Sequence, residues 1–369
     1  MGTWGSHRNQ PTKEAPDTML HAGLDLSRKR LDVCVLADDG TRLATTLCPP
    51  DADGLRHLVK EVRELGGPVQ AVIESMNGAR FVHDTLELHG WDVEIADAQK
   101  AKGLAPLTCK TDKIDAWVLA ELSRRDLVPS IWLPTPGVRA ERERARFRLH
   151  LVRHRVMLKN RIHATLLAFG KPCGMSDLFG LEGRELLARL DVPDPWRTDM
   201  ATALSLIDTL DEEIQAIEHE LQESGATHPY VQLLTTAPGI GWVLGYTIAA
   251  EIGDIHRFSS PKKLVGYTGL TPFVYQSGSS DRRGSLAKNG PKYLRWALIE
   301  ATTHASRHPA YKEHFDRTAE RLGRQRGKKV ARVEVARKLA EAIWHMCQTG
   351  AAFAPARSRD VSGRVTAPS

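Results

Sequence analysis

The sequence is short of cysteine and has no long apolar run, and each shortage excludes a class of protein. Its 369 residues hold five cysteines, at positions 34, 48, 109, 173 and 347, without C-x-x-C spacing. This pattern argues against a disulfide framework or a zinc site and favours a reducing cytoplasm. No apolar run approaches the length of a membrane span, and the polar N-terminus lacks the apolar stretch of a signal peptide. We therefore expect a cytoplasmic protein with no membrane partner.

Charge is unevenly distributed around a modest net value of +6. Residues 139–161 carry nine Arg or Lys and two Asp or Glu, and residues 281–332 carry fourteen and five. Either block alone is typical of a solvated helix face. Two such blocks on an otherwise acidic chain predict a polyanionic partner, and nucleic acid is the natural one.

The first section of the chain has the pattern of an α/β domain. We predict strands at 21–27, 30–40, 41–47, 70–75 and 92–98, and helices at 51–65, 78–89 and 111–126. Three strands in a meander, followed by alternating helices and strands, is an RNase H-like order. The length of the chain predicts two to three domains.

Four carboxylates occupy positions at which this order would bring them together. Asp25 lies in an apolar strand, Glu74 lies near the end of another, and Asp112 and Asp115 are three residues apart on one helix face. Two divalent ions held close together repel each other, so clustered carboxylates must hold them. Oxygen ligands suit Mg²⁺ or Mn²⁺. The four residues therefore predict metal-dependent phosphodiester chemistry, whereas any one of them alone reads equally well as an ordinary surface acid.

The middle of the chain is predicted to be helical. A basic helix at 138–170 is followed by an acidic helix with a heptad seam formed by Ile207, Leu210, Ile214, Ile217 and Leu221. These two helices could pair within one chain or between chains, and we favour dimerisation. The overall expectation is α/β plus α. Its segments are a disordered leader (1–18), the RNase H-like domain (19–137), a helical coiled-coil linker (138–227), a mostly helical C-terminal domain (228–350) and a disordered tail (351–369).

The C-terminal section begins with a glycine-containing turn between two helical patterns. The PGIG segment resembles a helix-hairpin-helix turn, in which Gly239 and Gly241 would let backbone N–H groups approach a DNA phosphate. A structural turn between helices is a comparable reading. The glycine spacing does not fit G-x-G-x-x-G, so dinucleotide binding is disfavoured.

A polar segment, QSGSSDRRGSLAKNG (276–290), follows and is predicted to be a flexible loop. Composition alone favours a linker. Basic residues in and after the segment favour a phosphate-binding surface instead. These candidate nucleic-acid-binding residues are Arg282, Arg283, Lys288, Lys292 and Arg295.

Taken in order, these motifs resemble the DEDD transposases of insertion-sequence family one-ten, relatives of the Piv DNA invertase. The matching segments are GLDLSRKRLDVCVLADDG, VIES, KTDKIDAWVLAEL, APGIGWVLGYTIAAEIGDIHRF and KLVGYTGLTPFVYQSGSSDRRGSLAKNGPKYLRWALIEAT. They span roughly 21–126 and 233–303, and KTDKIDA and the Ser-Gly segment are the distinctive ones. The leader and the tail lie outside the match.

The resemblance implies both a catalytic set and its partners. The DEDD tetrad would be Asp25, Glu74, Asp112 and Asp115, and it would bind Mg²⁺, with Mn²⁺ as the alternative. The nucleophilic serine would be Ser277, with Ser279 and Ser280 close enough to be alternatives. Donor and target DNA, a bridge RNA that pairs with both, and a homo-oligomer (dimer or tetramer) would be the partners. DNA would be cut through a phosphoserine intermediate and rejoined without hydrolysis.

Three other functions compete with this interpretation. A RuvC-like nuclease or resolvase would use metal-activated water in place of serine. A sugar-kinase or actin-like ATPase shares the opening strand and hairpin, but the second phosphate motif of that fold is missing from the C-terminal half of the sequence. A non-enzymatic nucleic-acid-binding protein would not need the four carboxylates.

Overall fold

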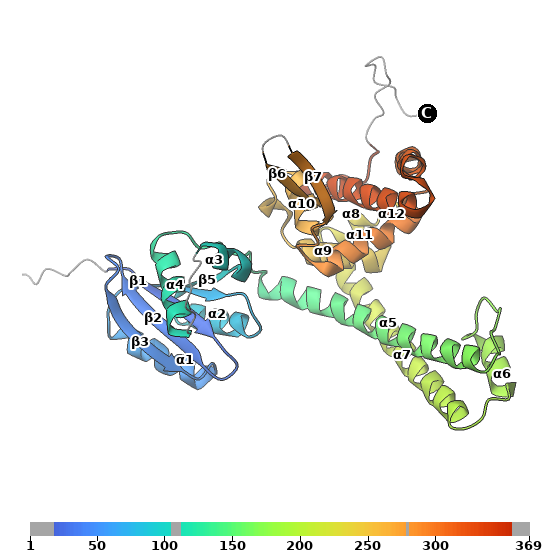
Figure 1. Cartoon of the computed structure of the whole chain (residues 1–369), viewed down its shortest axis with the longest axis horizontal. Helices are drawn as coiled ribbons and strands as arrows, with labels where there is room; N and C mark the ends of the chain where they lie inside the picture. Colours follow the sequence, from blue (N-terminus) through green and yellow to red (C-terminus); the bar gives the residue numbers. More distant parts are fainter. Residues whose placement is uncertain (1–17, 105–111, 278–279, 356–369) are drawn as a thin grey trace, which may run out of the picture. The chain divides into compact units, whose positions relative to one another are not determined.

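The computed structural model describes residues 18–104, 112–277 and 280–355, without the side chains of residues 112, 113, 274–277, 280–283 and 324. The chain divides into two compact units, one ending at Leu133 and the other beginning at Pro134 (Figure 1). Among these described residues, no helix combines the length and the apolar character needed to cross a membrane.

The first unit is built on a five-stranded mixed sheet. Its strands are β1 (Leu20–Leu26), β2 (Leu31–Ala37), β3 (Arg42–Cys48), β4 (Val69–Glu74) and β5 (Asp92–Ala96). They lie in the order β3-β2-β1-β4-β5. Strand β2 is antiparallel to both β1 and β3, and β4 and β5 are parallel to β1. The predicted meander and the strands that follow it are confirmed. The sheet is compatible with an RNase H-like domain.

Helices cover both faces of this sheet. They are α1 (Ala52–Arg63), α2 (Ala79–Leu88), α3 (Ala98–Leu104) and α4 (Asp112–Arg124). Buried residues of α1 and α2, such as Leu58 and Val82, pack with Leu24 on one face. On the other face, Ala116 and Ala120 of α4 pack against β2. Because side chains alternate along a strand, this two-sided cover assigns the residues of β1, β2 and β4 to one helix layer or the other.

The second unit is almost entirely helical. Its elements are α5 (Pro136–Ala168), α6 (Leu181–Arg189), α7 (Trp196–Thr227), α8 (Val231–Leu234), α9 (Trp242–Ile252), η1 (Ile255–Arg257), α10 (Pro261–Thr268), β6 (Pro272–Ser277), β7 (Ser280–Leu286), α11 (Lys292–Ala305) and α12 (Pro309–Thr349). The long helices α5 and α7 lie side by side (Figure 1). Helix α12 bends at Gly323, where φ is 74°.

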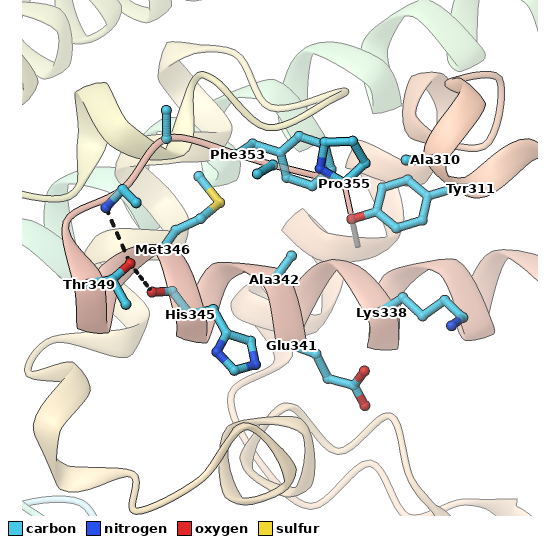
Figure 2. Close-up of a pocket in the computed structure, with 13 residues that line it drawn as sticks. Ala310, Tyr311, Lys338, Glu341, Ala342, His345, Met346, Thr349, Phe353 and Pro355 are labelled. Carbon is cyan, nitrogen blue, oxygen red and sulfur yellow. Dashed lines mark hydrogen bonds between the residues drawn. The ribbon is translucent and has the colours of Figure 1, made fainter. Parts of the chain in front are cut away.

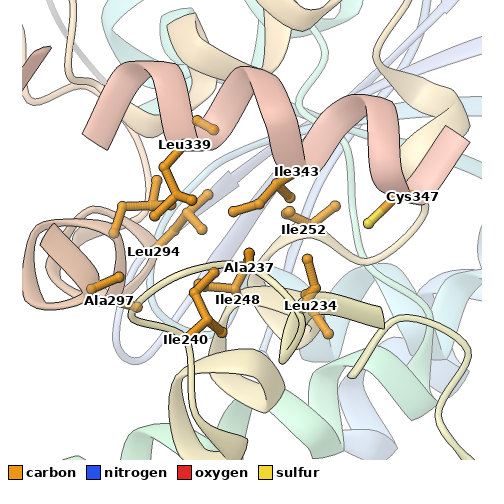
Figure 3. Packing of buried hydrophobic residues seen from close by; sticks show 14 of the residues in the cluster. Leu234, Ala237, Ile240, Ile248, Ile252, Leu294, Ala297, Leu339, Ile343 and Cys347 are labelled. Atoms are coloured by element: carbon orange, nitrogen blue, oxygen red, sulfur yellow. The ribbon is translucent and has the colours of Figure 1, made fainter. Parts of the chain in front are cut away.

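One large core holds the C-terminal part of this unit together. Figure 3 shows Leu234 of α8, Ile248 of α9 and Ile343 of α12 converging with Leu294 of α11. All four side chains are at most 1% exposed. The core therefore fixes the segments before and after the β6–β7 hairpin relative to each other.

The predicted heptad seam is buried within the chain. Ile207, Ile214, Ile217 and Leu221 are at most 4% exposed, and α7 packs along α5. The apolar seam on which we favoured dimerisation is thus filled by intramolecular packing.

Three local expectations differ from the structure. The predicted patterns include neither α3 nor α6, and α6 lies between the predicted basic and acidic helices. The flexible loop expected at 276–290 is wrong in part, because β6 and β7 pair as an antiparallel hairpin. Three strand-favouring residues, Phe273, Val274 and Tyr275, lead into this polar segment, and backbone pairing outweighs its loop-like composition.

Residues 351–355 fall within the predicted tail, and Phe353 packs on the helical part of the second unit. The backbone N–H of Phe353 donates to Thr236 Oγ1 at 2.9 Å. Its ring centroid lies 5.9 Å from that of His308 and 6.0 Å from that of Tyr311. The packed part of the second unit thus extends at least to Phe353.

Candidate functional site

The register of β1 and β4 brings two of the four predicted carboxylates side by side. Leu24 and Ile73 are paired across these parallel strands, and both side chains belong to the core shared with α1 and α2. Asp25 and Glu74 are the next residue on each strand, so alternation places them on the opposite face, towards α4. Both residues are partly exposed. This is the end of the sheet at which a metal-binding pair was expected.

Helix α4 lies unusually close to β1 because Gly23 has no side chain. A Cβ at this position would lie 1.8 Å from the carbonyl oxygen of Ala116 and 2.4 Å from the backbone nitrogen of Ala120. Gly23 is two residues before Asp25 and therefore on the same face. The glycine thus lets the helix that carries Asp112 and Asp115 approach the strand that carries Asp25.

Gly23→Ala is expected to lower the free energy of unfolding of the first unit by about 1–3 kcal/mol or more, because the added methyl group meets rigid backbone atoms. Gly103→Ala in α3 is the matched control, since a Cβ there meets no atom of the described residues within 4 Å. Denaturant unfolding of both variants beside the wild-type chain measures the difference. Equal midpoints for Gly23→Ala and the wild-type chain would contradict the close approach of α4 to β1.

A buried hydrogen-bonded chain also fixes α4 on the sheet. His21 Nδ1 lies 3.0 Å from Ser123 Oγ of α4, and His21 Nε2 lies 3.0 Å from Asp38 Oδ1. The order Ser-His-Asp matches that of a hydrolase triad. Ser123 is only 3% exposed, however, so this chain ties α4 to β1 and does not present a nucleophile to substrate.

The other two members of the predicted tetrad lie on α4. The helix begins at Asp112, and Asp115 one turn later is partly exposed. The side chain of Asp112 lies outside the described residues. Among the side chains that are described, no group of three or more His, Cys, Asp or Glu residues is placed to hold a metal ion. The backbone thus brings Asp25 and Glu74 to the face covered by α4, and the complete tetrad is not among the side chains described.

A fifth carboxylate, Asp32, lies on the same face and was missed. Asp32 pairs directly with Asp25 across the antiparallel β1–β2 ladder, and directly opposed residues share a face. Asp32 is 4% exposed, and Arg30 Nε donates to its Oδ2 at 2.6 Å. The two aspartates are equally distant from the turn at 28–29, and this symmetry could have revealed the pairing in the sequence.

The predicted nucleophile lies at the end of the hairpin. Ser277 is the last residue of β6 and pairs with Ser280, the first residue of β7. Ser279 lies outside the described residues. In the same register, Arg282 and Arg283 are opposite Tyr275 and Val274, but the side chains of the two arginines are not described.

The three remaining cations of this segment have different surroundings. Lys288 and Lys292 are exposed, and Lys292 Nζ lies 5.1 Å from the ring centroid of Tyr293. Arg295 is partly buried and donates from Nη1 to the carbonyl oxygen of Thr268 at 3.2 Å. Arg295 therefore caps the C-terminus of α10, and this structural role accounts for an arginine at this position even if it does not bind nucleic acid.

The PGIG turn is packed at its first glycine and open at its second. A Cβ at Gly239, whose φ is +80°, would lie 2.2 Å from the carbonyl oxygen of Ala301 in α11. At Gly241, the N-cap of α9, a Cβ would meet open space. Residues 235–241 line an open cavity of about 550 Å³ together with His304 and His308. The absence of a side chain at Gly239 thus lets the backbone of the turn approach the backbone of α11 closely.

Five of the nine cations of the basic block at 139–161 are engaged within the chain, so the charge of the block does not by itself indicate a nucleic-acid surface, and that role stays a prediction. Arg144 Nε donates to Glu220 Oε2 at 2.6 Å, and Arg148 Nε donates to Glu218 Oε1 at 2.9 Å. A third ion pair joins Arg155 of α5 to an acid of α7, Asp211. Because α7 supplies the acids, the predicted basic and acidic helices are partners within one chain.

A buried carboxylate ties α5 to the C-terminal end of α9. Glu251 is 1% exposed, and Arg146 donates to its two carboxylate oxygens at 2.7 and 2.9 Å. Arg142 donates to the backbone carbonyls of Ala250 and Glu251 at 2.8 and 2.6 Å. Two more cations of the basic block therefore serve the fold.

A cavity of about 450 Å³ lies between α12 and residues 351–355 (Figure 2). Phe353 and Pro355 close one side of it, near Tyr311. Burial raises the pKa of the Tyr311 phenol, which therefore stays protonated near neutral pH. Lys338 is the single cation in the lining. This composition does not match a polyphosphate ligand.

Two family models match the chain. Residues 231–317 match a family described as "Transposase IS116/IS110/IS902 family", and residues 22–170 match the DEDD transposase family of the IS110 type, described as "Transposase". The two matches cover the regions that hold the sheet carboxylates and the Ser-Gly hairpin.

Similar proteins carry the same description. The chain is 30% identical to the transposase for insertion sequence element IS1328 of Yersinia enterocolitica, over 78% of this chain and 86% of that protein. It is 26% identical to the transposase for insertion sequence element IS1111A of Coxiella burnetii, over 74% and 76%. A probable family 20 transposase of Pseudomonas aeruginosa is 25% identical over 67% and 74%.

Proposed function

The chain belongs to the IS116/IS110/IS902 family of insertion-sequence transposases, and we propose that it cuts and rejoins DNA through a serine nucleophile assisted by divalent metal ions. As a DNA transposase it acts on DNA. The observation that carries the proposal is the β1–β4 register, which puts Asp25 and Glu74 side by side on the face covered by α4. That helix begins with the two remaining acids of the tetrad, Asp112 and Asp115.

The donor set suits a hard divalent cation. Asp25, Glu74, Asp112 and Asp115 would offer only carboxylate oxygens, which Mg²⁺ and Mn²⁺ prefer over soft ligands. When bound, such ions supply activation of an attacking hydroxyl and stabilisation of the leaving oxygen of a phosphodiester. The role of the protein in this proposal is to hold the four acids on one face.

Ser277 is the proposed nucleophile. Its hydroxyl oxygen would form a bond to a DNA phosphorus, the phosphodiester P–O bond would break, and a DNA hydroxyl would be released. Attack by a hydroxyl of another strand on the phosphoserine would then restore both the serine and a phosphodiester. Rejoining therefore needs no hydrolysis and no external energy source.

A bridge RNA and a homo-oligomer complete the proposal. The cations of the bend in α12 support binding of a polyanion: Arg321, Lys328 and Lys329 are exposed, and no described acid lies within ion-pair distance of them. On α5, Met157 and Leu167 remain 62% and 65% exposed after the helix has packed on α7. Such side chains support a contact with a second chain.

The sharpest test is whether a covalent protein–DNA species forms. The protein, its guide RNA and labelled DNA bearing the element ends are incubated with Mg²⁺, denatured and separated by electrophoresis. We expect labelled DNA to migrate with the wild-type protein and to be released by protease. Cleaved DNA without any such species would favour the RuvC-like reading, in which water is the nucleophile.

A further inference from the structure

The β1–β2 turn borders an open cavity of about 460 Å³ close to the sheet carboxylates. The cavity is lined by Ser27, Lys29, Arg30, Leu47, Cys48 and Pro49. Cations and a hydroxyl line the side formed by the turn, and mostly apolar groups line the side formed by the end of β3. A nucleotide has the matching composition, with an anionic phosphate next to a less polar sugar and base.

The turn holds its cations in a fixed frame. Ser27 Oγ donates to the carbonyl oxygen of Arg30 at 2.8 Å and accepts from the Arg30 N–H at 3.1 Å. The Ser27 N–H also donates to that carbonyl oxygen at 2.8 Å. Three consecutive exposed cations, Arg28, Lys29 and Arg30, are therefore presented by a tight turn that directly follows β1.

Asp32 holds the side chain of Arg30 in place through an ion pair. The side chain of Arg30 is 44% exposed, whereas that of Asp32, to which its Nε donates, is 6% exposed. An ionised carboxylate at such a buried position needs a cationic partner. An ion pair with one buried and one exposed member restricts the arginine to a small set of orientations at the mouth of the cavity.

The cavity and the predicted metal ligands belong to one cross-strand row. Leu47 pairs with Asp32 across β2–β3, and Asp32 pairs with Asp25 across β1–β2. Two strand spacings of about 4.8 Å separate Leu47 from Asp25, roughly 10 Å in all. At about 3.4 Å per nucleotide along one strand of a duplex, this distance corresponds to about three nucleotides.

We propose that this cavity binds a nucleotide of the substrate DNA strand a few positions from the phosphate that is cut. Lys29 and Arg30 contact its phosphate, and Leu47 and Pro49 contact its sugar or base. Asp32 is a positioning residue that acts through Arg30. The inference rests on the proposed function in that Asp25 marks the cutting site, but binding of DNA in the cavity does not depend on cleavage.

The test compares salt-dependent DNA affinity in the full-length protein. Fluorescence anisotropy of a labelled DNA oligonucleotide is measured over a range of NaCl concentrations, with a chelator present so that no cleavage occurs. The Lys29→Gln/Arg30→Gln variant is compared with Lys60→Gln/Arg63→Gln, which removes the same charge from exposed positions of α1 on the other side of the sheet.

The two double variants are expected to differ in slope. Each lost phosphate contact makes the negative slope of log K against log salt shallower by about 0.7 to 0.9. The Lys29→Gln/Arg30→Gln variant should therefore have a slope shallower by about 1.5. The Lys60→Gln/Arg63→Gln control should keep the wild-type slope. An equal change of slope in both variants would show that only the net charge of the protein matters, and it would overturn the proposal.

Asp32→Asn separates positioning from charge. Removing an acid makes the protein more positive, so simple electrostatics predicts tighter DNA binding. Loss of the Arg30 anchor predicts weaker binding, together with roughly half of the reduction in salt slope that the double variant shows. A thermal melt close to that of the wild-type chain verifies folding, and tighter binding by Asp32→Asn would overturn the anchoring role.

Two further results distinguish the possible failures. The same comparison with an RNA strand of the same sequence tests the assignment to DNA, and a loss confined to RNA would overturn it. Full cleavage by Asp25→Asn would overturn the metal assignment of the proposed function, while the binding comparison would retain its meaning.

Discussion

Asp25→Asn is expected to abolish DNA cleavage and to leave DNA binding close to that of the wild-type protein. The substitution keeps the size of the side chain but removes the charge that a divalent cation needs from its ligand. Asp25 is the last residue but one of β1 and lies next to Glu74 on the face covered by α4. A loss of about 10³-fold in cleavage corresponds to roughly 4 kcal/mol of transition-state stabilisation.

Single-turnover cleavage and anisotropy with the same DNA measure the two effects. Asp92→Asn, an exposed acid at the start of β5 in the same sheet, is the matched control and should cleave normally. Cleavage by Asp25→Asn within about threefold of the wild-type rate, less than 1 kcal/mol, would remove Asp25 from the catalytic set. Equal loss of cleavage and of binding would indicate a misfolded first unit, which a thermal melt detects.

Ser277→Ala is expected to eliminate the covalent protein–DNA species and all rejoined product. The substitution removes one oxygen atom from the end of β6 and leaves the strand pairing of the hairpin in place. A hydroxyl that forms the bond to phosphorus has no substitute in alanine, so the expected loss is complete within detection. DNA binding should be unchanged, because neither charge nor backbone is altered.

Ser280→Ala is the matched control on the facing strand. Ser280 pairs with Ser277 across the hairpin, so its replacement disturbs the same turn without removing the proposed nucleophile. We expect this variant to form the covalent species. The reverse outcome, with Ser277→Ala active and Ser280→Ala inactive, would move the nucleophile to the other strand.

The strand order of the first unit could be predicted because each strand has its own signal. The apolar run around Asp25, the alternating segment after it and the buried strand before Glu74 differ in period from the intervening helices. The same patterns placed Asp25 within a strand and Glu74 near the end of another. That they share a face follows from the β1–β4 register, which a single strand does not specify.

Long-range pairing is the part that the sequence did not reveal. The bond between His21 and Ser123 and the close approach of α4 to Gly23 join residues about a hundred positions apart. The ion pair between Arg148 and Glu218 likewise joins two helices whose charge patterns were visible but whose partner choice was open. Local propensity carries no information on such contacts, so the basic block at 139–161 was interpreted as a surface for nucleic acid.

The hairpin formed by β6 and β7 illustrates the limit of composition. A Ser- and Gly-rich segment is typical of a linker, yet here its backbone groups pair in an antiparallel ladder. The strand-favouring residues from Phe273 to Tyr275 were the available signal, and the polar residues after them outweighed it in the prediction.

The most direct measurement is amplification across joined element ends after expression of the gene with its native flanking DNA in a heterologous bacterium. The wild-type chain, Ser277→Ala and Asp25→Ala are compared at equal protein levels. A DNA recombinase that combines a serine nucleophile with metal-binding carboxylates predicts a circular junction of single-nucleotide accuracy from the wild-type chain and none from either variant. Junctions at wild-type frequency from both variants would contradict that combination.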